Sequence, residues 1–156
     1  MRAAAVILAV LALAGLAGCD LVGTPTVVFG SLVLPSWYLV PEGTGFQVIL
    51  YAGGTPMDIA TSFETAPRAV VVDGQFPVTG GSYDTANYQV AEVPAGTYTA
   101  FAWVDVDGDG ALDPWTDFFG WHGAAASFDT QPAANVVVAE AGLADVDFML
   151  SQYSAQ

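Results

Sequence analysis

The most telling strand of the chain reads TYTAFAWVD, from Thr97 to Asp105. Successive side chains of a strand point to opposite faces of a sheet. One face would carry Tyr98, Ala100, Ala102 and Val104. The other face would carry Phe101 and Trp103. Because both faces are apolar, this pattern predicts a central strand, or one that a loop covers, instead of a strand with one wet face.

Six further runs are short, apolar or alternating, and bounded by turn residues. They are Thr26–Leu34, Gly45–Ala52, Arg68–Asp73, Asn87–Val93, Asn135–Ala139 and Ala144–Leu150. In the last run Asp145 and Asp147 alternate with apolar residues, so one face should be buried and the other wet. The 3.6-residue period of an amphipathic helix is missing. The sequence therefore predicts an all-β fold, a single β-sandwich of about seven strands.

The connections are predicted from their turn residues. Val93–Gly96 is expected to be a tight turn that joins its neighbours as a hairpin, with Gly96 free to adopt positive φ. Gly53–Pro67 and Gly108–Pro132 are expected to be loops. The second is longer and rich in aromatic residues, and a loop of that length in a compact domain is usually functional or tied down.

Two segments carry a family resemblance. Val93–Asp105, VPAGTYTAFAWVD, and Val146–Leu150, VDFML, resemble the end of prealbumin-like (transthyretin-like) β-sandwiches, including carboxypeptidase regulatory-like domains. The resemblance implies a prealbumin-like fold in which these segments form a turn, a central strand and the final strand. It implies little about function, because such domains are mostly accessory modules.

The N-terminus has the pattern of an export signal. Arg2 precedes an uncharged run, Ala3–Gly18, that is shorter than a membrane-spanning helix requires. The stretch Leu16-Ala17-Gly18-Cys19 resembles a bacterial lipobox, which implies cleavage before Cys19 and a diacylglycerol on its sulfur. We therefore expect residues 1–18 to be a signal peptide, 19–25 a lipidated tether and 26–156 the β-sandwich domain. The alternative is an ordinary secretory signal followed by a chance cysteine.

Charge and composition narrow the range of partners. The chain has 16 acidic and two basic residues, a net charge of −14, and 54% hydrophobic residues. Without residues 1–18, Arg68 is the only Arg or Lys. Such a surface repels nucleic acid and can attract cations, while the hydrophobic content argues against disorder. The expected partner is the membrane of a bacterial cell envelope, reached through lipid on Cys19; the choice between inner and outer membrane is left open.

The sharpest motif is the acidic run that begins at Asp105. Its spacing matches the first three-quarters of a calcium loop, with oxygen ligands at positions 1, 3, 5, 7 and 9 and Gly110 at position 6. The expected ligands are Asp105, Asp107, Asp109, the Ala111 carbonyl and Asp113. Ca²⁺ wants six to eight oxygens, and alternate carboxylates on a curling loop converge on one point. Leu112 would anchor the loop to the core.

The run departs from an EF-hand at position 12, which is Thr116, while Asp117 comes one residue late. Asp117 would therefore complete the ligand set only through a one-residue bulge of the loop 105–117, which is similar to calcium loops placed on bacterial β-sandwiches. The alternative is a solvated acidic turn, although its carboxylates would then repel one another. We expect a structural Ca²⁺ of weak affinity, on the order of 10⁻⁴ to 10⁻³ M.

Four aromatic residues follow directly: Trp115, Phe118, Phe119 and Trp121. They could form a binding platform for sugar or peptide, or fold back over a sheet face. His122 alone is a poor transition-metal site. No nucleophile or phosphate-binding motif is present, so no catalytic residue is predicted and the chain is not expected to be an enzyme; a small hydrolase is the weakest option. A calcium-stabilised accessory or adhesion module and a glycan or small-ligand binder remain, and the exposure of Trp115 and Trp121 should discriminate them.

Overall fold

The computed structural model describes residues 26–53, 68–77, 82–123, 133–140 and 143–152. All the regular structure in these ranges is β, and none of them forms a helix that could span a membrane. The predicted signal peptide, the lipobox Leu16–Cys19 and the tether lie outside the described residues, as does nearly all of the predicted loop Gly53–Pro67.

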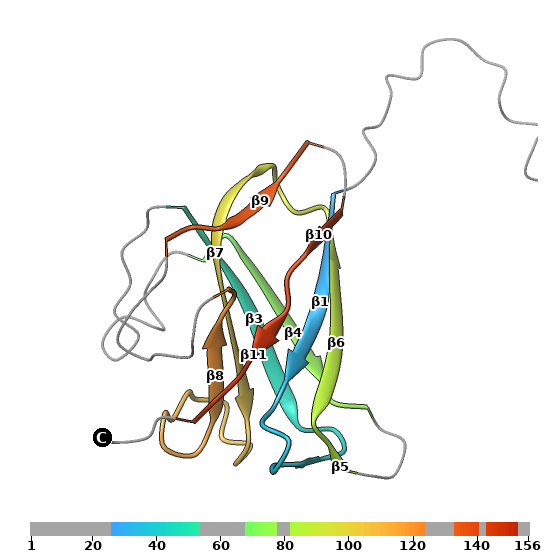
Figure 1. Cartoon of the computed structure of the whole chain (residues 1–156), viewed down its shortest axis with the longest axis vertical. Helices are drawn as coiled ribbons and strands as arrows, with labels where there is room; N and C mark the ends of the chain where they lie inside the picture. Colours follow the sequence, from blue (N-terminus) through green and yellow to red (C-terminus); the bar gives the residue numbers. More distant parts are fainter. Residues whose placement is uncertain (1–25, 54–67, 78–81, 124–132, 141–142, 153–156) are drawn as a thin grey trace, which may run out of the picture.

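The strands form two main sheets that pack face to face (Figure 1). In the first sheet, β1 (Val27–Val33) lies between β6 (Thr85–Ala91) and the two pieces β10 (Leu143–Asp145) and β11 (Phe148–Met149). The second sheet contains β4 (Val70–Gln75), β3 (Gly45–Ala52), β7 (Gly96–Asp105), β8 (Phe118–Trp121) and β9 (Val136–Val138). A small ribbon joins β2 (Val40–Pro41) to β5 (Ser82–Tyr83). The all-β sandwich predicted from the sequence is confirmed.

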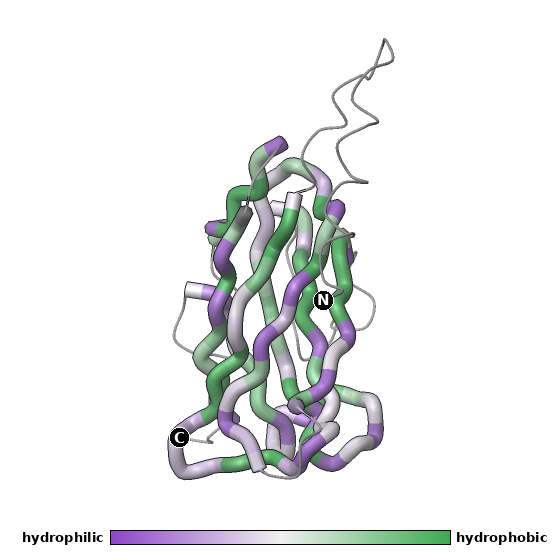
Figure 2. The backbone as a smooth tube through the Cα atoms, turned by 90° about the vertical axis from the view of Figure 1, so that its right-hand side faces the viewer, coloured by the Kyte–Doolittle hydropathy of each residue, from purple (hydrophilic) through white to green (hydrophobic). Residues whose placement is uncertain are grey.

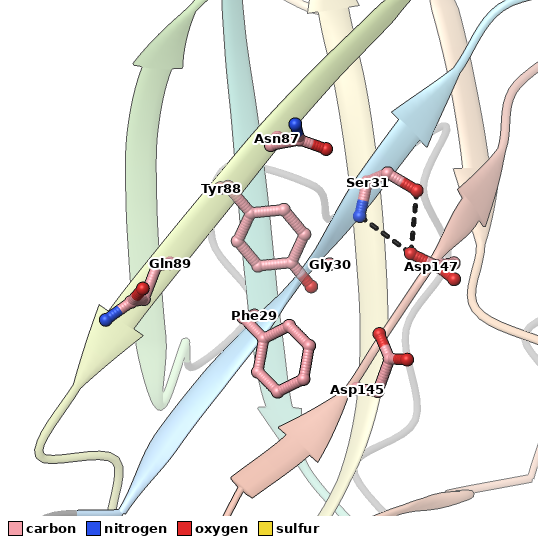
Figure 3. Close-up of a pocket in the computed structure, with 8 residues that line it drawn as sticks. All are labelled: Phe29, Gly30, Ser31, Asn87, Tyr88, Gln89, Asp145 and Asp147. Carbon is pink, nitrogen blue, oxygen red and sulfur yellow. Dashed lines mark hydrogen bonds between the residues drawn. The ribbon is translucent and has the colours of Figure 1, made fainter.

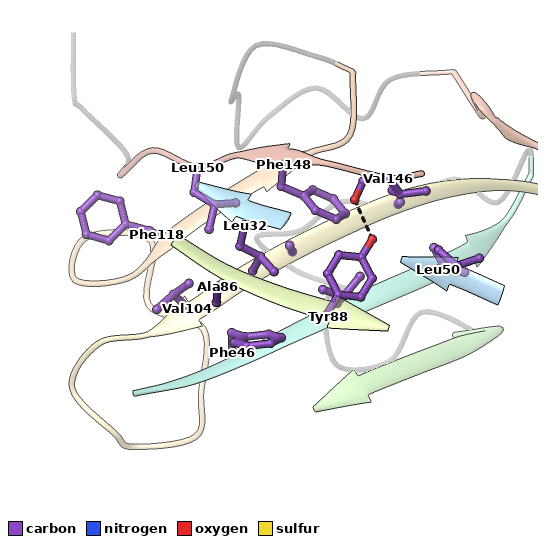
Figure 4. Packing of buried hydrophobic residues seen from close by; sticks show 14 of the residues in the cluster. Leu32, Phe46, Leu50, Ala86, Tyr88, Val104, Phe118, Val146, Phe148 and Leu150 are labelled. Carbon is purple, nitrogen blue, oxygen red and sulfur yellow. Dashed lines mark hydrogen bonds between the residues drawn. The ribbon is translucent and has the colours of Figure 1, made fainter. Parts of the chain in front are cut away.

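The core fills the space between the two sheets (Figure 4). Alternate residues of the strands contribute to it, because successive side chains of a strand point to opposite faces of its sheet. Members from five strands are Leu32, Leu50, Tyr88, Val104 and Phe148. The buried Tyr88 hydroxyl donates a 2.7 Å hydrogen bond to the Val146 carbonyl oxygen, so the one polar atom of this ring is satisfied.

The final run alternates as predicted. Val146, Phe148 and Leu150 are at most 4% exposed, whereas Asp145 and Asp147 are exposed. The same alternation of hydrophilic and hydrophobic residues follows several strands in Figure 2. β10 and β11 both run parallel to β1. The two pieces keep the same register with β1, and a short break separates them. Glycine is required at position 30 because a β-carbon there would collide with the Val146 carbonyl.

β7 is the central, doubly buried strand that the sequence predicted. It pairs with β3 on one side and with β8 and β9 on the other. Its outward residues belong to a second apolar cluster, made of Ile49, Tyr51, Phe101, Trp103, Phe119 and Trp121. The prediction of a loop over Gly108–Pro132 is wrong for Phe118–Trp121, which forms a strand. Phe119 and Trp121 alternate with Phe118 and Gly120, and pairing with β7 satisfies backbone groups that a buried loop would leave unpaired.

The segment Val93–Gly96 is not the turn of a hairpin, which corrects a second expectation. β6 pairs with β1 and β7 pairs with β3, so this connection crosses from one sheet to the other. Gly96 does not have positive φ; Glu92 does, with φ of 62°. The Tyr98 hydroxyl donates a 2.7 Å bond to the Pro94 carbonyl and holds the crossing in place. β6 pairs with β1 at seven positions and β7 pairs with β3 at eight, and this pairing within each layer replaces pairing between the two sequence neighbours.

Candidate functional site

The acidic loop connects β7 to β8 at one end of the sandwich (Figure 1). Asp105 is the last residue of β7, and the chain then curls sharply. Gly108 and Gly110 have φ of 76° and 78°, a left-handed conformation that is strained for other residues. The sequence assigned this turning role to Gly110, and the structure adds Gly108. Two such glycines close together bend the chain so that alternate side chains turn toward a common point.

The carboxylates of Asp105, Asp107 and Asp109 lie together as that geometry requires. Each offers an oxygen atom, and the three oxygens lie within 4.8 Å of one another. Asp105 is half-buried, and the other two are exposed. The loop's own backbone orients them, since Asp105 accepts bonds from the N–H groups of Gly108 and Gly110 at 2.8 and 3.0 Å. Each carboxylate has about four acceptor positions, so these bonds leave room for a cation.

Asp117 occupies a different position from these three. It is 0% exposed, and its two oxygens accept backbone hydrogen bonds from Val106 and Asp113, both at 2.9 Å. Asp117 thus ties the two ends of the loop together. Burial raises its pKa to about 6, against the opposing effect of the bonds from Asp113 and Val106 and with a further contribution from the charges of Asp107 and Asp105. Sequence reasoning placed Asp117 beside the ion and missed this clamping role.

The remaining predicted ligands lie on the same loop but outside the group of three. Asp113 accepts a 2.9 Å bond from the Trp115 N–H, and Ala111 is exposed with its N–H bonded to Asp109. Leu112 packs against the second apolar cluster, which confirms its predicted anchoring role. The structure therefore brings together three of the six predicted ligands by their side chains.

The four aromatic residues do not form one exposed platform. Trp115 is 61% exposed, whereas Phe118, Phe119 and Trp121 are at most 1% exposed. Phe119 and Trp121 pack on Phe101, with ring centroids 6.3 and 4.8 Å apart. The burial of three of the four rings supports the interpretation that this segment covers a sheet face. Trp115 and Trp121 therefore do not discriminate between the accessory module and the ligand binder, because one ring is exposed and the other is buried.

Two other features were not anticipated from the sequence. Tyr51 and Trp121 each carry a buried polar atom without a hydrogen bond in the part of the chain that the structure describes. A hollow also opens on the outer face of the first sheet, around Phe29. The alternation of Asp145 and Asp147 indicated a wet face there, but only the long-range pairing of β1 with β6 and β10 brings the other residues of the hollow together.

His122 has the modest role expected of it. Its Nδ1 atom lies 2.8 Å from the Asp147 carbonyl oxygen, and its ring meets Phe148 edge to face. In the described ranges it is not part of any group of metal-ligating side chains.

Comparisons with family models, with curated proteins and with solved structures found no match to this chain. Of the predicted family features, the β-rich fold and the cluster of three Asp residues are supported.

Proposed function

We propose that the chain is a lipoprotein of the bacterial envelope, anchored through Cys19, whose β-sandwich carries one structural Ca²⁺ in the loop 105–117. The module would serve as an accessory or adhesion domain and not as an enzyme. The observation that carries the calcium proposal is the convergence of three carboxylates within 4.8 Å on a single short loop. The lipobox-like stretch Leu16–Cys19 supports the anchor.

Calcium fits this cluster better than other ions do. Its ligands are all oxygens, and no His or Cys joins Asp105, Asp107 and Asp109 in the described residues. Hard cations prefer oxygen, and a loop that offers many oxygens without rigid octahedral geometry suits Ca²⁺ over Mg²⁺. Three carboxylates this close repel one another at neutral pH, and a divalent cation would remove that repulsion. The Ala111 carbonyl and Asp113 are the proposed additional ligands.

A bound ion would work together with the Asp117 clamp. The clamp holds the backbone at Val106, between the first two proposed ligands, and at Asp113, the last of them. The ion would hold the outer part of the loop, and the clamp already holds its base. We propose that Ca²⁺ therefore makes the whole β7–β8 connection rigid and adds to the stability of the sandwich.

The anchor and the loop would lie at opposite ends of the domain. β1 begins at the end of the sandwich opposite the β7–β8 connection (Figure 1). A lipid on Cys19, a few residues before β1, would hold the first of these ends near the membrane. The calcium loop, which includes the exposed Trp115, would then project away from the bilayer. This orientation suits a domain that contacts other components of the envelope.

The finer classification rests on the resemblance. The doubly buried strand Gly96–Asp105 and the final strand with its Val146–Leu150 pattern support a prealbumin-like sandwich. That class would favour an accessory role over catalysis.

The calcium proposal can be tested by isothermal titration of the full-length chain, purified in detergent and stripped with chelator. We expect one Ca²⁺ per chain and little heat with Mg²⁺. Asp107→Asn combined with Asp109→Asn keeps the backbone hydrogen bonds but should abolish binding. The control Asp145→Asn combined with Asp147→Asn removes the same charge elsewhere and should leave binding unchanged. If both double variants lost calcium binding equally, the binding would depend only on the net charge of the chain.

The anchor can be tested separately by metabolic labelling with a clickable fatty acid. The wild-type chain should take up label and run as a shorter, processed form. Cys19→Ser should take up none. Label that persists on the Ser variant would rule out lipidation at this residue.

A further inference from the structure

The outer face of the first sheet contains an open hollow with a volume of about 390 Å³ (Figure 3). Besides Gly30 and the core residue Tyr88, six side chains line it: Phe29, Ser31, Asn87, Gln89, Asp145 and Asp147. They come from β1, β6 and the segment Asp145–Asp147, which are neighbours in the sheet but far apart in the sequence. The calcium loop is not part of this hollow.

Strand register arranges these side chains in two rows. In the first row Phe29 of β1 lies directly between Gln89 of β6 and Asp145 of β10. In the second row Ser31 lies opposite Asn87, and on its other side it donates to Asp147. Side chains directly opposite on one sheet face are about 5 Å apart at their β-carbons. The rows therefore place one aromatic ring among two carboxylates, two amides and a hydroxyl.

Asp147 is held in a fixed, charged state. Its Oδ1 atom accepts hydrogen bonds from the hydroxyl and the backbone N–H of Ser31, both at 2.7 Å. These two bonds lower the pKa of Asp147, against a small effect of burial and with some help from the charge of His122. Neither bond uses Oδ2, so that oxygen can accept a donor from a ligand. Asp147 is thus an ionised carboxylate, oriented by the sheet and partly open.

The negative charge of the hollow favours a cationic ligand. It contains two acidic side chains and no basic one, in a chain of net charge −14. Sugar hydroxyls can donate to the two carboxylates, but a neutral sugar leaves their charge uncompensated, whereas a cation compensates it. A calcium ion would need the carboxylates to converge, but residues two apart on an extended segment are about 6.6 Å apart along the chain. A flat organic cation would match both the ring and the carboxylates.

We propose that this hollow binds the guanidinium group of an arginine side chain on a basic partner peptide. The planar group would lie against the Phe29 ring, and its N–H donors would reach Asp145 and the free oxygen of Asp147. Guanidinium combines these two features, because it stacks on aromatic faces and presents several donors in a rigid fork. The Asn87 and Gln89 amides would contact the peptide around it. The proposal does not depend on calcium.

The test uses the ¹⁵N-labelled full-length chain in detergent, titrated with N-acetyl-argininamide and, separately, with its uncharged analogue N-acetyl-citrullinamide. The arginine probe should shift the backbone amide of Ser31 and the side-chain amides of Asn87 and Gln89. Citrulline should bind at least about fivefold more weakly, because it lacks the charge. Raising the salt concentration should weaken the arginine complex.

Two variants and two controls locate the binding. Asp145→Asn and Phe29→Leu should each weaken arginine binding about two- to fivefold, the range expected for one exposed ion pair or cation–π contact. Asp73→Asn removes an exposed carboxylate from the other sheet and should have no effect. The pair Asp107→Asn and Asp109→Asn should also have none.

Three results would overturn the proposal. Equal binding of arginine and citrulline would remove the role of charge. Equal weakening by Asp145→Asn and Asp73→Asn would indicate general attraction to an acidic protein. Shifts of the same amides by a neutral disaccharide, with none by arginine, would assign the hollow to glycans.

Discussion

Two acidic regions of this molecule start from the same spacing and end in different geometry. Asp105, Asp107 and Asp109 alternate along the chain, and so do Asp145 and Asp147. In the first region the chain curls and the carboxylate oxygens come within 4.8 Å. In the second the chain stays extended alongside β1, and the carboxylates lie along one sheet face with Phe29 and Ser31 as neighbours.

The difference teaches that backbone shape decides what alternating acids can bind. Gly108 and Gly110 allow the curl, and no such residue lies between Asp145 and Asp147. A convergent cluster suits one small divalent ion, whereas a spread pair suits a larger organic cation. The two regions also differ in how they are held in place. The buried Asp117 carboxylate secures the loop, and the Tyr88 hydroxyl bonds to the extended segment at Val146.

The largest effect should come from the buried clamp. Asp117→Ala leaves the N–H groups of Val106 and Asp113 without acceptors and should lower the free energy of unfolding by about 2–4 kcal/mol. Asp145→Ala, on the exposed region, should change it by less than about 0.5 kcal/mol. Urea unfolding in chelator at pH 5, below the pKa of Asp117, measures both. Similar values for the two variants would mean that Asp117 does not hold the loop.

The two regions should respond to pH with opposite signs. The pKa of Asp117 is about 6 in the folded chain and 3.8 in the ordinary state, so folding favours its protonated form. Without calcium, its contribution is fully present below pH 3.8 and is lost as the pH rises through about 6, a change of up to about 3 kcal/mol. Asp147 has a lowered pKa, so its contribution is present above the ordinary Asp pKa and is lost as the pH falls below it.

Chemical unfolding from pH 4 to 8 in chelator tests the predicted loss of stability that Asp117 causes as the pH rises. Asp117→Asn cannot titrate, so its stability should depend less on pH between 5 and 7 than that of the wild type. If both proteins follow the same curve, the pH dependence comes from the general repulsion of a highly acidic chain and not from Asp117.

A smaller effect should appear at the tyrosine that supports the extended region. Tyr88→Phe removes a buried 2.7 Å bond to the Val146 carbonyl and should cost about 1–2 kcal/mol. Tyr51→Phe is the matched control. Burial raises the pKa of Tyr51 to about 12 against the charge and the hydrogen-bonding contact of Arg68, and that contact falls short of the geometry of a well-formed hydrogen bond. Removal of the hydroxyl should be nearly neutral or stabilising. Thermal unfolding of both variants ranks them, and an equal loss would contradict this assignment.

The local patterns of the sequence were sufficient for much of the fold. Gly45–Ala52 was predicted with the bounds of β3, and the two apolar faces of Gly96–Asp105 correctly indicated a central strand. These features depend only on the two-residue period of a strand. The crossing at Val93–Gly96 could not be foreseen, because partner choice depends on distant strands.

The candidate sites follow the same division. The Asp105–Asp109 cluster is local, so its spacing alone predicted the convergence. The clamping role of Asp117 depends on how deeply the loop base is buried, which spacing does not reveal. The hollow around Phe29 requires parallel pairing between segments 116 residues apart, as in the Ser31–Asp147 bond. Such pairing carries no local signal.

A melting curve tests directly whether calcium binds to the folded loop 105–117. Free Ca²⁺ at ten times Kd should stabilise the full-length chain by about 1.4 kcal/mol, which raises Tm by a few degrees relative to chelator. Asp107→Asn with Asp109→Asn should abolish this shift, and Asp145→Asn with Asp147→Asn should retain it. If millimolar calcium leaves the wild-type curve where chelator leaves it, the loop is an acidic turn and the calcium site does not exist.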